Sequence, residues 1–166
     1  MKTFSHFLFV ISCLFFLGCG ISKDDAEAYD QQLDKIFEEH LADLTNLKVD
    51  SVFKTLNNTP DSLLDYATLE NIFAAVIESC NKTEKKFLSI EDLDVEIPCA
   101  KIHAEFVATE RKNYALFQKM FLAKKEGDIV TLTALSPQLT ELKKEIMSKR
   151  DMMIFKTKLF RKEHMN

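Results

Sequence analysis

The sequence contains few of the residues that interrupt helices. Its 166 residues include three glycines, three prolines and no tryptophan, while leucine, lysine, glutamate, aspartate, alanine and phenylalanine dominate. No internal repeat, low-complexity tract or second long apolar segment is present. Glycine and proline mark turns, and the abundant residues are mostly good helix formers. The composition therefore predicts one all-α domain.

Known catalytic and cofactor motifs are also missing. The chain has no His-Glu-x-x-His or Glu-x-x-His pair, no Cys-x-x-Cys-His, no Gly-x-Ser-x-Gly and no glycine-rich phosphate loop. Asp92, Asp94 and Glu96 are spaced like calcium ligands, but Ile97 stands where the loop needs glycine. We therefore predict no catalytic residue, no metal site and no cofactor, and we expect a protein that is not an enzyme.

The net charge of −4 is too small to indicate a polyanionic partner, so nucleic-acid binding is not expected. Charge is nevertheless uneven along the chain. Most of the charged residues at 24–43 are acidic, and most of those at 143–162 are basic. Opposite charge favours contact between the first and last helices, although each exposed ion pair contributes little.

The N-terminus has the features of an export signal. Met1 and Lys2 precede an apolar run at 7–17, which is too short for a comfortable membrane span and is followed by small residues at 18–20. Export places the protein outside the cytoplasm. The predicted divisions are a signal peptide at 1–18, a short tether at 19–24 and a helical domain at 25–166.

The segment Phe16-Leu17-Gly18-Cys19 resembles the lipobox of bacterial lipoproteins, in which a cysteine is acylated and becomes the new N-terminus. Leu17, Gly18 and Cys19 match the pattern, whereas Phe16 is larger than the usual residue. The segment ending at Cys13 also fits, but leaves a shorter apolar core. The resemblance implies lipid attachment at Cys19 and a membrane-anchored position in the cell envelope, facing the periplasm or the exterior. There are two alternatives. The signal peptide is cleaved after Gly20 and the protein is secreted in soluble form, or the segment stays uncleaved as a membrane anchor.

Two cysteines, Cys80 and Cys99, remain available as thiols after either cleavage. An even pair in an oxidising compartment predicts a disulfide, which would close a loop of about 20 residues and stabilise the fold by about 3 kcal/mol. Two buried reduced thiols are the alternative. A metal site is not expected here, because neither cysteine has a second one two to four residues away.

Apolar residues recur at helical spacing through most of the domain. Between Cys80 and Cys99 the alternating Leu93–Ile97 segment interrupts this pattern and predicts an extended connector. The fold class expected is thus a bundle of about four main helices with one disulfide-tethered connector. The predicted main helices are 25–48, 61–80, 100–125 and 137–162. Residues 49–56 either extend the first helix or form a short extra turn, and a short helix starts at Asp128.

The end of the last helix is apolar around more of its circumference than a single core stripe requires. Such an end can close the core, which we expect, or it can dock on a partner protein or an anionic membrane surface. The residues predicted for partner binding are Phe155, Lys156, Phe160, Arg161 and Lys162.

The functional prediction is a small, exported, lipid-anchored envelope protein with a non-enzymatic binding or structural role towards an unidentified envelope protein. The alternative is a ligand or haem carrier. In that case His103 and one of Met120, Met152 or Met153 would ligate haem from facing helices.

Overall fold

The computed structural model describes residues 20–59 and 63–166, and within these ranges all regular secondary structure is helical. The predicted all-α fold is therefore confirmed. The signal segment and Cys19 lie outside the described residues. The helices are α2 (Lys23–Asn46), α3 (Val49–Asn58), α4 (Tyr66–Leu88), α5 (Cys99–Glu126) and α6 (Ile129–His164).

Short polar side chains fix where three of the helices begin. Ser22, Asp65 and Asp128 precede α2, α4 and α6, and each accepts a hydrogen bond from the backbone amide three residues later, at 3.1, 3.1 and 3.0 Å. Such caps satisfy amides that the first helical turn leaves unpaired. Gly127 ends α5 in a left-handed conformation with φ 70°, which glycine adopts without steric cost.

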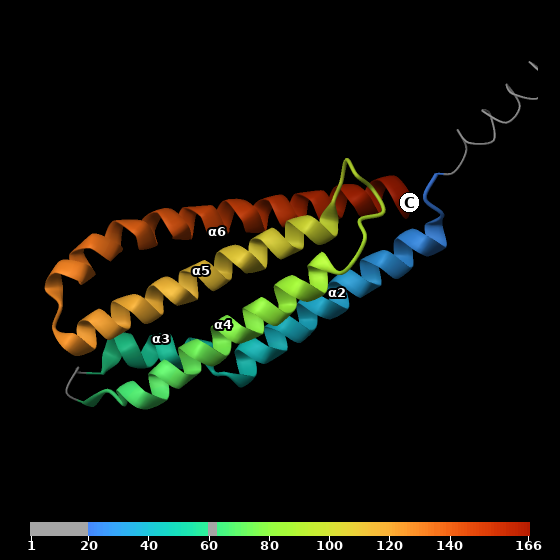
Figure 1. Ribbon diagram of the computed structural model, residues 1–166. Helices are drawn as coiled ribbons and strands as arrows, with labels where there is room; N and C mark the ends of the chain where they lie inside the picture. Colours follow the sequence, from blue (N-terminus) through green and yellow to red (C-terminus); the bar gives the residue numbers. More distant parts are fainter. Residues whose placement is uncertain (1–19, 60–62) are drawn as a thin grey trace, which may run out of the picture.

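The four long helices form an up-and-down bundle (Figure 1). α5 lies between α4 and α6, and it makes the most extensive contacts with these two helices. α2 packs against α4 and has a smaller contact with α6. The start of α2, the connector Ser89–Pro98 and the end of α6 lie at one end of the bundle, whereas α3 lies towards the other end.

The buried apolar residues form two clusters along the bundle. The larger cluster joins α2, α4, α5 and the C-terminal part of α6, and the smaller one lies between α3, α4 and the C-terminal part of α5. Main members of the larger cluster are Tyr29, Leu33, Val76, Phe87, Val107 and Phe160. The smaller cluster consists of Val52, Leu64, Leu69, Phe73 and Phe121.

The predicted disulfide is wrong, because Cys80 and Cys99 are both free and buried in the structure. α4 does not end near Cys80 but continues for eight residues to Leu88, with Phe87 fully buried. Phe87, near the end of α4, lies beside His103, four residues into α5, with 5.1 Å between ring centroids. Cys80 is seven residues before Phe87, so the two cysteines are about 16 Å apart along the bundle axis. A disulfide needs Cα atoms within about 7 Å of one another.

A hydrogen-bonded carboxylate ties the connector to the bundle instead. Asp92 accepts hydrogen bonds from the Tyr29 hydroxyl at 2.5 Å, the Ala100 amide at 2.7 Å and the Lys101 amide at 3.3 Å. Two of these donors belong to the first turn of α5, where a negative charge is stabilised by the helix dipole. Asp92 thus holds the connector against both α2 and α5.

α6 begins eight residues earlier than the predicted main helix and runs through Pro137. A proline inside a helix removes one backbone hydrogen bond and crowds the carbonyl four residues before it, here that of Thr133. Thr133 and Pro137 are both exposed, so water is available to the freed carbonyl. The predicted short helix from Asp128 and the long one after Ser136 are therefore a single helix.

Candidate functional site

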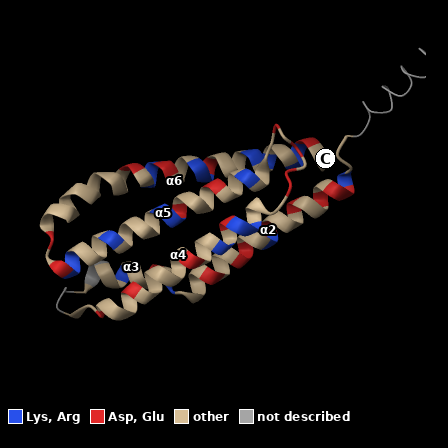
Figure 2. Cartoon of the chain, viewed as in Figure 1, with Lys and Arg blue, Asp and Glu red and all other residues tan. Residues whose placement is uncertain are grey.

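α6 leaves large apolar side chains in solvent along both of its halves. Phe155 is 60% exposed, Met147 57% and Val130 81%. Residues 129–140 contain no charged side chain, although this part of α6 lies on the surface, as Figure 2 shows. The exposed large apolar residues of α6 are Ile129, Val130, Met147, Met152, Ile154 and Phe155.

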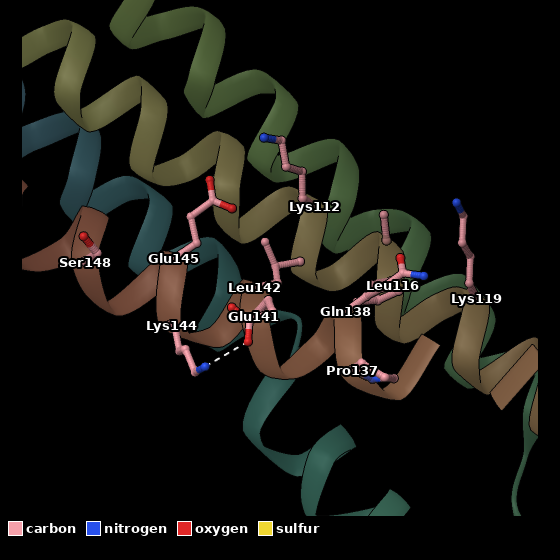
Figure 3. A pocket seen from close by; sticks show the side chains of 11 residues that line it. Lys112, Leu116, Lys119, Pro137, Gln138, Glu141, Leu142, Lys144, Glu145 and Ser148 are labelled. Carbon is pink, nitrogen blue, oxygen red and sulfur yellow. Dashed lines mark hydrogen bonds and ion pairs between the residues drawn. The ribbon is translucent and has the colours of Figure 1, made fainter. Parts of the chain in front are cut away.

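An open groove of about 970 Å³ separates α5 from the middle of α6 (Figure 3). We call it the α5–α6 groove. Leu116 and Ala115 contribute apolar surface from α5, and Leu142 and Pro137 do so from α6. The complete lining consists of Lys112, Ala115, Leu116, Lys119, Pro137, Gln138, Glu141, Leu142, Lys144, Glu145 and Ser148.

The two sides of the α5–α6 groove differ in charge. α5 contributes Lys112 and Lys119, whereas α6 contributes Glu141 and Glu145. Lys144 also belongs to the α6 side, but its ammonium group donates a hydrogen bond to Glu141 at 2.8 Å. The groove therefore has a basic edge on α5 and a predominantly acidic edge on α6.

Met152 and Phe155 extend the groove towards the C-terminal end of α6. Met152 lies four residues after Ser148, which lines the groove, and Phe155 lies three residues after Met152. These intervals place all three residues on one side of the helix. From Pro137 to Phe155 this side of α6 is about 27 Å long, since an α-helix rises 1.5 Å per residue. The groove and this apolar extension together form the candidate interaction surface.

The structure separates the residues predicted for partner binding into two groups. Phe155 and Lys162 are exposed. Phe160 is fully buried beside Tyr29, with 5.2 Å between ring centroids. Arg161 donates hydrogen bonds to the carboxylates of α2 described below, and Lys156 donates one to the Glu96 carbonyl at 3.3 Å. Core closure, the expected alternative, is thus confirmed for Phe160, whereas Phe155 remains open to a partner.

Arg161 connects the ends of the chain through an ion-pair network. Its Nε donates to both oxygens of Asp30, at 2.8 and 2.9 Å, and its Nη2 donates to both oxygens of Asp34, at 2.9 and 2.7 Å. The Asp30 carboxylate is mostly buried. The expected contact between the acidic first helix and the basic last helix is therefore confirmed.

Several polar side chains inside the bundle are paired with one another, whereas Oδ1 of Asn113 is buried without a hydrogen-bond partner. His40 is buried and contacts Glu110 at 3.1 Å through Nε2 and Thr83 at 3.3 Å through Nδ1. Ser79 donates to Asp43 at 2.9 Å. These side chains join α2, α4 and α5 through the bundle interior, which is a structural role.

The histidine considered for haem, His103, is enclosed by aromatic rings. The centroids of Phe37 and Phe87 lie 6.1 and 5.1 Å from that of the imidazole, and Nδ1 donates to the Cys99 carbonyl at 2.8 Å. Burial lowers the pKa of His103. Of the three methionines considered as its partner, Met153 is buried, Met152 is exposed, and Met120 lines a small pocket beside Pro137.

Both free thiols have strongly raised pKa values. Burial raises the pKa of Cys80 and of Cys99 to about 12 in each case, so both remain protonated near neutral pH. Because the thiolate is the nucleophile, neither cysteine is suited to nucleophilic catalysis. Sequence reasoning assigned these residues a cross-linking role that their separation along the bundle axis does not allow.

No family model, curated protein or solved structure matches this chain. Within residues 20–59 and 63–166, none of the helices combines the length and apolarity needed to cross a membrane. The groove residues were not predicted from the sequence as a binding surface, because Leu116 and Leu142 have the ordinary spacing of core positions. The one available signal was the uncharged stretch at 129–140.

Proposed function

We propose that this protein is a lipid-anchored component of the bacterial cell envelope that binds a helical segment of another protein. The observation that supports the binding role is the α5–α6 groove with its extension at Met152 and Phe155. A surface of about 27 Å that carries Leu142, Met152 and Phe155 among charged side chains fits one face of an amphipathic helix. The exposed side chains of Met152 and Phe155 would then be covered in the complex.

The charges at the groove edges define the chemistry of this helix. Lys112 and Lys119 on α5 would pair with carboxylates along one side of the partner helix. Glu141 and Glu145 on α6 would pair with basic residues along its other side. Such complementarity sets orientation and excludes wrong partners more than it adds affinity. Aromatic residues are frequent energetic anchors of interfaces, which gives Phe155 the central role.

Envelope attachment rests on the lipobox-like segment ending at Cys19. Acyl chains on this residue would hold the domain at a membrane surface, because two lipid signals already suffice for stable anchoring. Only Gly20, Ile21 and Ser22 separate Cys19 from the first residue of α2. The anchored domain would therefore stay within about 15 Å of the bilayer.

Replacing Cys19 with alanine tests the anchor. We expect the Cys19→Ala protein to leave the membrane fraction or to accumulate unprocessed, and the wild-type N-terminus to carry acyl chains in mass spectra. The Cys13→Ala variant is the matched control and should behave like wild type. An unacylated mature N-terminus at Ile21, with unchanged fractionation of Cys19→Ala, would refute lipid attachment.

A photo-crosslinking amino acid at position 155 tests the binding surface in intact envelopes. We expect a discrete crosslinked product from position 155 and none from position 130, which is at least as exposed but lies outside the groove. Glu substitution of Leu142 should abolish the product from position 155. Equal crosslinking from both positions would argue against a specific surface, and a product of twice the chain mass would identify a second copy as the occupant.

A ligand carrier is the second candidate, because the groove volume lies within the range of small-molecule sites. In this version the apolar wall of Leu116 and Leu142 would hold an apolar ligand. Native mass spectrometry and an absorption spectrum of the protein purified from its own envelope test this candidate. A bound small molecule or a haem band supports it, and the free mass with no visible absorption counts against it.

A further inference from the structure

His164 differs from the other histidines of the described chain in its access to solvent. His40 and His103 are buried, and both are hydrogen-bonded inside the bundle. The His164 side chain is 19% exposed to solvent and lies on the last turn of α6. Cys80 and Cys99 are buried as well. Among the histidines and cysteines of residues 20–59 and 63–166, His164 is thus the one that a metal ion in solution can reach.

Two carboxylates accompany this imidazole. The Nε2 atom of His164 lies 2.8 Å from Oδ2 of Asp94, which belongs to the connector between α4 and α5. Glu163 precedes His164 on α6, and the potential ligand atoms of the three residues all lie within 4.8 Å of one another. Residues about 70 positions apart in the chain therefore supply one set of nitrogen and oxygen donors.

Neighbouring groups orient the two closest donors. Oδ1 of Asp94 accepts hydrogen bonds from the amides of Glu96 at 2.8 Å and Ile97 at 3.1 Å, which leaves Oδ2 directed at the imidazole. The His164 ring lies against the buried ring of Phe160, with 4.8 Å between centroids. Such supporting contacts fix the direction of metal ligands in known sites.

We propose that Asp94, Glu163 and His164 form a binding site for one divalent transition-metal ion, with Zn²⁺ as the best match. One imidazole and two carboxylates, with a fourth position open to water, form a donor set of the kind zinc accepts. Zinc bonds of about 2.0–2.1 Å at a tetrahedral angle place two donor atoms about 3.4 Å apart. Asp94 and His164 would separate by about 0.6 Å from their present distance, and Glu163, which is exposed, would rotate inwards.

This site goes beyond the proposed binding function and does not depend on it. The ion would replace the present hydrogen bond between Asp94 and His164 and would tie the connector to the end of α6. Because it would bind the folded chain and not the unfolded one, zinc should stabilise the protein. Hard cations such as Mg²⁺ and Ca²⁺ prefer all-oxygen sites and should not compete.

The test is calorimetric titration of ZnCl₂ into the untagged mature protein. We expect one ion per chain, at least tenfold weaker binding in both Asp94→Asn and His164→Ala, and unchanged binding in Asp151→Asn. Asp151 is the matched control because it is an exposed carboxylate on the same helix. Excess MgCl₂ or CaCl₂ should leave the zinc affinity unchanged.

A measurement on the wild-type protein keeps the proposal testable even if a variant unfolds. In proton NMR spectra, ZnCl₂ should shift the imidazole signals of His164 and leave those of His40 and His103 in place. Absence of a one-to-one binding event, or zinc binding that neither changes the His164 signals nor weakens in His164→Ala, would overturn the proposal. In that case the contact between Asp94 and His164 is a hydrogen bond and not part of a metal site.

Discussion

The two halves of α6 have different environments although they belong to one continuous helix. The C-terminal half, residues 149–164, contains both buried residues of α6, Met153 and Phe160, and contacts α2 through Arg161 and the connector through Lys156. The N-terminal half, residues 129–148, has no buried residue and borders the α5–α6 groove. The number of neighbouring elements, not the sequence of the helix, therefore decides which half closes the core and which remains available for binding.

Truncating Phe160 should produce the largest loss of stability. Phe160→Ala removes a fully buried ring from the contact between α2 and α6, and such substitutions cost about 3–5 kcal/mol. Val130→Ala, in the exposed N-terminal half, should change the free energy of unfolding by less than about 0.5 kcal/mol. Urea denaturation followed by circular dichroism measures both values. Similar losses in the two variants would mean that the halves of α6 are equally packed.

Removing the Arg161 side chain, also in the C-terminal half of α6, should lower the free energy of unfolding less than truncating Phe160. Arg161→Ala would leave the mostly buried Asp30 carboxylate without its partner, at a cost of about 2 kcal/mol. Arg161→Lys should recover part of this loss, because lysine keeps the charge but not the two-pronged geometry. In the background of Asp30→Asn, the effect of Arg161→Ala should shrink. Additive effects in this double-mutant cycle would contradict a direct interaction.

The smallest expected effect is the pH dependence of stability that comes from His103, which is buried in the bundle. Burial lowers the folded-state pKa of His103 below its ordinary value of 6.5, so the unfolded chain binds a proton first as the pH falls. Stability is therefore unaffected by this group above about pH 6.5 and decreases as the pH falls from 6.5 towards the folded-state pKa. His103→Asn, which keeps a donor near the Cys99 carbonyl, should reduce the slope of unfolding free energy between pH 7 and about pH 5. Unchanged slopes in the variant would show that other groups cause the pH dependence.

Most helices were predictable because local rules and core packing agree there. Asp128 and Gly127 mark a helix start and a helix end by their own chemistry, and both act as expected. The end of α4 was missed because the polar run after Cys80 hides a buried face that continues to Phe87. The passage of α6 through Pro137 was missed because only the structure shows that the freed carbonyl is exposed.

The candidate site was less predictable than the fold. Phe155 and Phe160 lie five residues apart in similar sequence surroundings, yet one is exposed and the other is fully buried. The sequence signals an apolar helix end but not which side of it faces Tyr29. Leu116 and Leu142 of the groove likewise have the spacing of core residues. Leu116 on α5 is buried, whereas Leu142 on α6 is only partly buried.

The amino-acid sequence by itself determines the helical class, most helix boundaries and the attraction between an acidic first helix and a basic last one, because these follow from local propensity, capping and charge. Tertiary structure decides which thiols, rings and carboxylates meet. Cys80 and Cys99 suggest a disulfide by number and compartment, but the added turns of α4 separate them along the bundle axis. Nothing in the sequence pairs Asp94 with His164, and chain folding brings them to 2.8 Å because the connector crosses the end of α6.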